Sequence, residues 1–262
     1  MTTSPSRFGL SAEHRAAARG STAVVTTSWD DGHVYDYALA NLLDQYGLPG
    51  TFYISPRDCE LPSRARLTPR DISALGDRFE IGGHTMTHVR LPTLSDAAAA
   101  REIADGKTYL EDVAGKAVTS FCYPGGAYDR RHVSMVADAG FAVARTVERH
   151  RIDWPGNPLE MPTSFNTYRH LSDPRAAYDW AVRSPRRAAR LFLNWEEWAI
   201  EMFERVLTFG GVFHLWGHSW EIAANNDWSR LERVFAHISR RDGVTYVPNG
   251  SVLEHAPPAG AA

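Results

Sequence analysis

The sequence predicts a single parallel α/β domain that curls toward a barrel, and three observations support this fold class. Short β-branched or aromatic runs alternate with amphipathic stretches about seven times along the chain. No segment is repeated, and no linker rich in Pro, Gly or Ser divides the chain. A chain of 262 residues is long enough to bury one large core, so a single domain suffices.

The first half of the chain begins with a buried strand over residues 23–29, which runs directly into Asp30-Asp31-Gly32. Apolar residues at helical spacing then predict a helix that ends near Gly47, a residue suited to a left-handed C-cap. Ser95 is a good N-cap for a helix that continues to about Val113. The other elements predicted here are strands over 51–54, 79–81 and 118–123, a loop over 56–70 and a short helix over 71–75.

Helices predominate in the second half of the chain. The dipeptides Asp173-Pro174 and Ser184-Pro185 are typical of an N-cap followed by the first helical residue, so each predicts a helix. The second of these helices carries an apolar stripe from Leu191 to Val206, which we interpret as core packing. The remaining elements are helices near 129–139 and 228–240, strands over 141–147, 212–213 and 244–247, and an irregular segment over 150–170.

Composition narrows the classes of function. The net charge of −3 argues against nucleic acid as the main partner. The N-terminus has no apolar signal-peptide region, and no later run is long enough to span a membrane. The two cysteines, Cys59 and Cys122, do not make a disulfide framework. These observations favour a cytoplasmic protein, and nothing in the sequence indicates an oligomeric state.

Polar clusters follow three of the apolar runs. In a parallel α/β fold the carboxyl ends of the strands share one face, so these side chains are expected to lie close together. One Asp and two His would hold a metal ion with open positions for water and substrate. A second Asp could then act as general base and a further His as general acid. The clusters are Asp30 with Asp31, His84 with His88, and His214 with His218.

These clusters resemble the motifs of the polysaccharide deacetylases of the NodB homology type, carbohydrate esterase family 4. Residues 27–32 (TSWDDG) resemble the family's TFDDG motif, and residues 84–88 (HTMTH) resemble its H(S/T)xxH motif. Residues 48–53 are similar to the second-strand segment, and residues 121–126 (FCYPGG) to the third motif. Residues 211–215 (GVFHL) stand where the last, histidine-bearing motif is expected. The resemblance covers roughly residues 22–250.

The resemblance implies a distorted (β/α)7 barrel and a metal-dependent hydrolase. Asp30 would be the catalytic base, the backbone N–H of Gly125 would help to stabilise the oxyanion, and His214 would protonate the leaving amine. The cofactor would be a divalent metal, with Zn²⁺ expected and Co²⁺, Ni²⁺ or Fe²⁺ as alternatives. The implied metal ligands are Asp31, His84 and His88.

The sequence departs from the family pattern at several of these positions. Cys122 occupies the place of an Arg that orients the base, and Arg145 on the following strand could supply the missing guanidinium to Asp30. His214 lies in an unusual sequence context, so the acid could instead be His218. A substrate-binding role is expected for Tyr123, Arg145, Trp216 and His218, although Trp216 could equally close the barrel mouth.

The function expected on this basis is removal of an N-acyl group, chiefly acetyl, from an amino sugar or a related small glycoside. The partner is therefore a small-molecule or glycan amide. Hydrolysis of a formamide or cyclic amide is an alternative within the superfamily, and a non-catalytic carbohydrate-binding protein is an alternative from another class. A non-haem iron oxygenase would also use two His and one carboxylate.

We expect three parts along the chain. Residues 1–20 form a flexible leader, and residues 256–262 form a tail. The barrel domain occupies residues 21–255 and includes a helical insertion at about 173–208.

Overall fold

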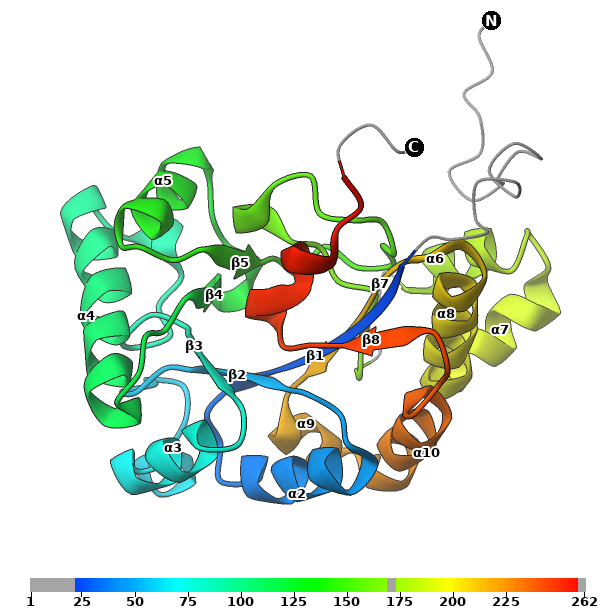
Figure 1. Cartoon of the computed structure of the whole chain (residues 1–262), viewed down its shortest axis with the longest axis horizontal. Helices are drawn as coiled ribbons and strands as arrows, with labels where there is room; N and C mark the ends of the chain where they lie inside the picture. The colour runs from blue at the N-terminus through cyan, green and yellow to red at the C-terminus, as the bar shows by residue number, and fades with distance from the viewer. Residues whose placement is uncertain (1–21, 169–172, 259–262) are drawn as a thin grey trace, which may run out of the picture.

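A computed structural model describes residues 22–168 and 173–258 of the chain. The predicted leader over residues 1–20 lies outside the described residues, as does the part of the predicted tail beyond residue 258. The described strands form one curled sheet that helices enclose (Figure 1). This confirms the predicted fold class, the distorted (β/α)7 barrel. No helix in the described ranges is long and apolar enough to cross a membrane.

The strands are arranged in the order β5-β4-β3-β2-β1-β7-β6, and β8 pairs with the beginning of β1. Each ladder between these strands is parallel. Because the strands are parallel, their carboxyl ends meet at one face of the barrel. The strands are β1 (Ala23–Asp31), β2 (Thr51–Ile54), β3 (Glu80–Gly83), β4 (Ser120–Cys122), β5 (Val143–Arg145), β6 (Phe165–Asn166), β7 (Gly211–Gly217) and β8 (Val244–Tyr246).

Helices cover the outer side of the sheet, with α3, α4 and α5 beside β3 to β5 and with α8 and α10 beside β7 and β8 (Figure 1). Their apolar faces pack into one large buried cluster. The helices are α2 (Asp36–Tyr46), α3 (Pro69–Gly76), α4 (Asp96–Ala114), α5 (Arg130–Asp138), α6 (Asp173–Trp180), α7 (Pro185–Leu193), α8 (Trp195–Phe209), α9 (Ser219–Ala224) and α10 (Trp228–Ile238).

Four elements differ from the prediction. Strand β6 lies in the segment predicted to be irregular, and helix α9 was not predicted. The strand predicted over 212–213 is longer, because β7 continues to Gly217 in register with β1. The single helix predicted from residue 185 to Val206 is two helices, α7 and α8. Asn194 separates them because its backbone leaves the helical region (φ −118°, ψ 76°), and its side-chain amide donates to the carbonyl of Arg190 in the last turn of α7.

A segment without regular strand structure closes the barrel between β5 and β7. Met161 donates its N–H to Ala144 O (2.8 Å) and accepts from Thr146 N (2.9 Å). Three residues later, Ser164 donates its N–H to His214 O on β7 (2.9 Å). The gap at the edge of the sheet is therefore bridged by main-chain hydrogen bonds.

Alternate residues of β1 point into the barrel and form layers from its floor to its mouth. Val24 belongs to a small apolar cluster at the floor. Thr26 donates to Asn249 Oδ1 (2.8 Å), which lies on the 3₁₀ helix η5 (Asn249–His255) that plugs the floor. Ser28 bonds His214 one layer higher, and Asp30 reaches the mouth. The inward-facing polar residues of β1 are therefore paired, layer by layer, up to the candidate site.

Candidate active site

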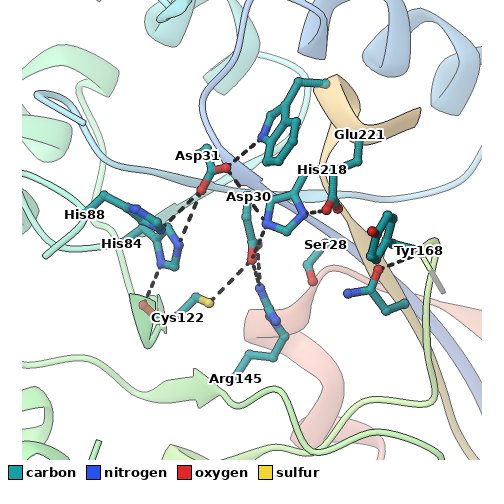
Figure 2. A network of polar contacts seen from close by, with 12 residues as sticks. Ser28, Asp30, Asp31, His84, His88, Cys122, Arg145, Tyr168, His218 and Glu221 are labelled. Atoms are coloured by element: carbon teal, nitrogen blue, oxygen red, sulfur yellow. Dashed lines mark hydrogen bonds and ion pairs between the residues drawn. The ribbon is translucent and has the colours of Figure 1, made fainter. Parts of the chain in front are cut away.

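The first feature of the site is a buried ion pair between Asp30 and Arg145. The Arg145 guanidinium bonds both carboxylate oxygens of Asp30, and the two side chains are 0% and 4% exposed (Figure 2). Burial alone would raise the pKa of Asp30, but the positive charge of Arg145, assisted by His84 and His218, lowers it overall. Asp30 is therefore ionised at neutral pH.

The Arg145 guanidinium is itself held by aromatic rings. It lies 4.2 Å from the ring centroid of Trp216 and 5.4 Å from that of Tyr53. Arg145 is the register partner of Cys122 on β4, and the Cys122 thiol lies 3.8 Å from Asp30 Oδ2. The neighbouring strand thus supplies a guanidinium at the same level of the barrel as Cys122. The ion pair that the sequence predicts between Arg145 and Asp30 is present.

The second feature is a group formed by Asp31, His84 and His88 that fits a metal ion. Asp31 Oδ1 lies 3.7 Å from His84 Nε2 and 3.4 Å from His88 Nε2 (Figure 2). This buried oxygen accepts no hydrogen bond from the residues that the structure describes. His84 Nδ1 lies 2.8 Å from Cys122 O, a carbonyl that fixes the proton on Nδ1 and leaves Nε2 free to bind a metal. One carboxylate and two imidazoles are a donor set that suits Zn²⁺ and related ions.

Helix α4 holds the loop that carries the two histidines. Met86 donates its N–H to Glu102 O (3.0 Å), and Thr87 donates its N–H and hydroxyl to the Glu102 carboxylate (2.9 and 3.0 Å). Gly106, one turn later, lies against the Thr85 backbone, and a Cβ there would be 2.9 Å from Thr85 C. Thr85 and His88 both have positive φ angles, 61° and 63°, so the loop needs these external contacts to keep its shape.

The third feature is His218, which lies at the mouth opposite the two histidines (Figure 2). Its Nε2 is 3.9 Å from a carboxylate oxygen of both Asp30 and Asp31, and its Nδ1 is 2.5 Å from Glu221 Oε2. Burial disfavours the charged ring, but Glu221, Asp31 and Asp30 outweigh it and raise the pKa of His218 to about 9. His218 is therefore a protonated imidazolium at neutral pH.

His214 lies one layer deeper than His218. In the β1–β7 register His214 is opposite Thr26, and its Nε2 bonds the Ser28 hydroxyl at 2.9 Å. Burial, followed by the charge of Arg145, lowers the pKa of His214 to about 3, so the ring is neutral. The same register places Gly217 opposite Trp29, so the next residue, His218, stands level with Asp30.

Residues 17–144 match the model of the family described as Polysaccharide deacetylase. The matched segment contains Asp30 and the group formed by Asp31, His84 and His88. Over these residues the chain matches the polysaccharide deacetylase family. This family comprises deacetylases that act on glycans. No curated protein matches the chain at a significant level.

Solved structures agree with this family in fold. A Mycobacterium smegmatis protein assigned as a polysaccharide deacetylase is 18% identical, with 90% of each chain covered and a TM-score of 0.62. The chitin deacetylase of Colletotrichum lindemuthianum is 17% identical over 91% of this chain and 90% of its own, with a TM-score of 0.56. The Streptococcus pyogenes deacetylase PplD is 21% identical over 59% of this chain and 72% of its own, with a TM-score of 0.51. At these identities the likeness establishes the fold alone.

Two residues that the sequence associates with substrate are buried, and Gly125, a candidate oxyanion donor, is exposed. Tyr123 is fully buried, donates its hydroxyl to Leu159 O (3.0 Å) and stacks on Tyr128. Trp216 is 4% exposed and covers Arg145, which is itself fully buried. Gly125 is exposed and has a φ of 59°, in the 3₁₀ turn η3 (Pro124–Gly126) after β4.

Two residues of the site have roles that the sequence analysis does not assign. Trp220 donates its indole N–H to Asp31 Oδ2 (2.8 Å) and so orients a candidate metal ligand. Glu221 binds the far nitrogen of His218. Glu221 follows His218 by three residues, and residues three apart on a helix are neighbours on its surface. This spacing is the one feature of the sequence that could have predicted the contact.

Replacement of Gly106 by Ala should weaken metal binding without unfolding the domain. The new methyl group would press on the Thr85–Met86 backbone and move the loop that carries His84 and His88. We expect zinc affinity, measured by competition with a chromophoric chelator, to fall by about tenfold or more, as for other outer contacts of metal ligands. Gly115→Ala at the end of the same helix is the control, because a methyl group there meets no other atom. Alanine at the φ of 65° of this position lowers stability, so the control also measures the effect of stability alone on zinc affinity. Unchanged zinc affinity in Gly106→Ala would show that α4 does not set the loop geometry.

Proposed function

We propose that this protein is a metal-dependent hydrolase that removes an N-acyl group, chiefly acetyl, from an amino sugar or a related small glycoside. One observation carries the proposal. An ionised carboxylate, Asp30, and a protonated imidazole, His218, flank a group of residues that fits a divalent metal. Amide hydrolysis needs a base and an acid on opposite sides of an electrophilic centre, and this arrangement provides them.

Asp31, His84 and His88 would hold the metal, with Zn²⁺ proposed. When bound, such an ion acidifies water and polarises the carbonyl of the scissile amide. A base as weak as Asp30 needs an acidified water, because its own pKa is lowered by Arg145. Asp30 can therefore act as the base only on a water that a metal held by Asp31, His84 and His88 has acidified.

Asp30 takes the proton of the attacking water, and Arg145 keeps the Asp30 carboxylate pointing toward it. The peptide N–H of Gly125 is available to donate a hydrogen bond to the oxyanion that forms at the carbonyl. His218 then gives its Nε2 proton to the amide nitrogen as the C–N bond breaks. The products are a carboxylate and a free amine.

We assign the acid to His218 rather than to His214 for two reasons. A general acid must carry a proton at working pH, and His218 does so while His214 is neutral. A general acid must also reach the substrate, and His218 stands level with Asp30 while His214 is bonded to Ser28 below it. A reducing, cytoplasmic setting is part of the proposal and is supported by the free thiols of Cys59 and Cys122.

The direct test is release of acetate and free amine from N-acetylated amino sugars and short oligosaccharides by the purified chain. Metal-free protein should be inactive, and Zn²⁺ or Co²⁺ should restore turnover. Asp30→Asn should lower kcat by at least about 10²-fold, the usual scale for general-base catalysis, with metal content unchanged. Asp44→Asn, at an exposed ion pair with Arg78, is the control.

Failure of the metal-loaded protein to release any acyl group would overturn the proposal. Sugar binding without turnover would then favour a carbohydrate-binding protein. Formate release from formamides in place of acetate release would favour the related hydrolase.

The role of His218 predicts how activity depends on pH. His218 must be protonated to act, so kcat/KM should fall as pH rises through the pKa of His218. The Glu221 carboxylate raises that pKa, so Glu221→Gln should lower it and move the alkaline limb to lower pH by about 1 to 2 units. Glu232→Gln, at an exposed carboxylate that accepts from Tyr46, should leave the limb in place.

The same variant can be checked without substrate. NMR titration of His218 in metal-free protein should give a raised pKa in the wild type and a lower one in Glu221→Gln. If the alkaline limb of kcat/KM stays in place in Glu221→Gln but moves in His214→Gln, the general acid is His214 and not His218.

Arg145→Lys tests the ion pair that orients the base. Lysine keeps the positive charge but has no planar group to lie flat on Trp216, so its nitrogen is not held in one direction toward the Asp30 carboxylate. We expect kcat to fall by about 10²-fold, the loss typical of a misplaced catalytic group, with metal content retained. Arg78→Lys at the exposed pair with Asp44 is the matched control and should be neutral. Turnover near that of the wild type would contradict a positioning role for Arg145.

A further inference from the structure

Two carboxylates face the side of His88 that points away from Asp31. His88 Nε2 is directed toward Asp31 Oδ1, as Figure 2 shows. Its other nitrogen, Nδ1, lies 3.4 Å from Glu60 Oε2 and 3.9 Å from Asp58 Oδ2. Both acids belong to the loop that follows β2, a segment that has no part in the proposed chemistry.

Asp58 is built rigidly into this loop. It is 2% exposed, and its Oδ1 accepts the N–H groups of Glu60 (2.7 Å) and Leu61 (3.0 Å). Its Oδ2 is buried and accepts no hydrogen bond from the described part of the chain. One oxygen therefore shapes the loop, while the other is left for His88.

The loop is also tied directly to the segment that carries the histidines. Arg57 donates its N–H to Met86 O (2.8 Å), and Cys59 donates its N–H to Thr87 O (3.1 Å). These two bonds flank Asp58 in sequence and fix its position relative to His88. The approach of Asp58 Oδ2 to the imidazole is thus imposed by the main chain.

We propose that Asp58 is a positioning residue that keeps the proton of His88 on Nδ1 and so presents Nε2 as a metal ligand. The inference rests on the proposed metal site. A carboxylate beside Nδ1 stabilises the tautomer with its proton there and makes Nε2 a stronger donor. At His84 the proton is kept on Nδ1 by a neutral group, the Cys122 carbonyl. The two imidazoles are therefore held by different means, one by a peptide dipole and one by a charge.

Glu60 is nearer to Nδ1 than Asp58, but its side chain is 63% exposed. An exposed carboxylate on a flexible side chain is screened by water and loses conformational entropy when it is held in place. Asp58 is buried and already fixed, so its charge acts on His88 in a medium that screens less. The effect on His88 is therefore assigned to Asp58, and Glu60 provides a matched comparison.

The test uses Asp58→Asn and Glu60→Gln in the full chain. Asparagine keeps an oxygen that can accept the N–H groups of Glu60 and Leu61, and it replaces the oxygen that faces His88 by an NH₂ group. Zinc affinity is measured by chelator competition, and the His88 tautomer is read from imidazole ¹⁵N shifts of metal-free protein. We expect zinc affinity to fall by about 10- to 100-fold in Asp58→Asn, and the Nδ1–H tautomer of His88 to lose population. Glu60→Gln should change the affinity by less than about threefold.

The outcomes separate this inference from the proposed function. Zinc affinity and tautomer both unchanged in a folded Asp58→Asn, with a wild-type melting temperature, would overturn the role of Asp58. A larger loss in Glu60→Gln than in Asp58→Asn would transfer the role to Glu60 and also overturn it. Wild-type protein that binds no zinc would refute the metal site, while the tautomer of metal-free protein would still decide the effect of Asp58 on His88.

Discussion

The buried ion pair between Asp30 and Arg145 is the constraint on which the rest of the site depends. Two charges removed from water lose a large solvation energy, which their attraction offsets only when the geometry is good. Here a single guanidinium nitrogen, Nη2, contacts both oxygens of the carboxylate, and the face of Trp216 covers the guanidinium. Removal of either partner would leave an uncompensated buried charge, a loss of roughly 3–5 kcal/mol in other proteins. The pair therefore orients Asp30, and it also holds the ends of β1 and β5 together at the barrel mouth, because separating the two buried charges would be costly.

The barrel makes this pair possible because its interior is polar in layers. A charged group above a purely apolar core would have no partners below it. In this protein Ser28 and His214 satisfy each other beneath Asp30, and Thr26 and Asn249 do so one layer further down. Each inward-facing polar residue of β1 thus meets a partner from another strand or from the plug.

Much of the fold and part of the site could be predicted from sequence, and the reasons differ from residue to residue. Asp31 and His84 lie at the carboxyl ends of strands and His88 lies on the loop that follows, so parallel strands bring all three to one face of the barrel. The pairing of Arg145 with Asp30 could be inferred because a carboxylate in that place needs a guanidinium and Cys122 cannot supply one. The extent of β7 could not be inferred, because Leu215 to Gly217 read equally well as strand or loop. A strand that ended at residue 213 would place His214 at the mouth, whereas the strand that ends at Gly217 places His218 there.

The residues that support the ligands were the least predictable. Asp58, Glu102 and Glu221 lie in a loop or on helices, and each acts through a contact that depends on how two elements pack. Ordinary acidic residues in such places are usually solvated, so nothing in their local sequence sets them apart. The break at Asn194 is a similar case, because an apolar stripe that continues across it gives no sign that the helix ends.

The pairing of β1 has a consequence for the order in which the protein can fold. This strand is the centre of the sheet, yet its partners in β7, β8 and the plug are far along the chain, and Thr26 and Asn249 are 223 residues apart. During synthesis β1 can pair early with β2, but its other edge stays open until β7 has left the ribosome. A strand edge exposed for that long is prone to non-native pairing. Nascent chains should therefore rely on chaperones until β7 is available, and loop closure over this distance should make refolding of the isolated protein slow.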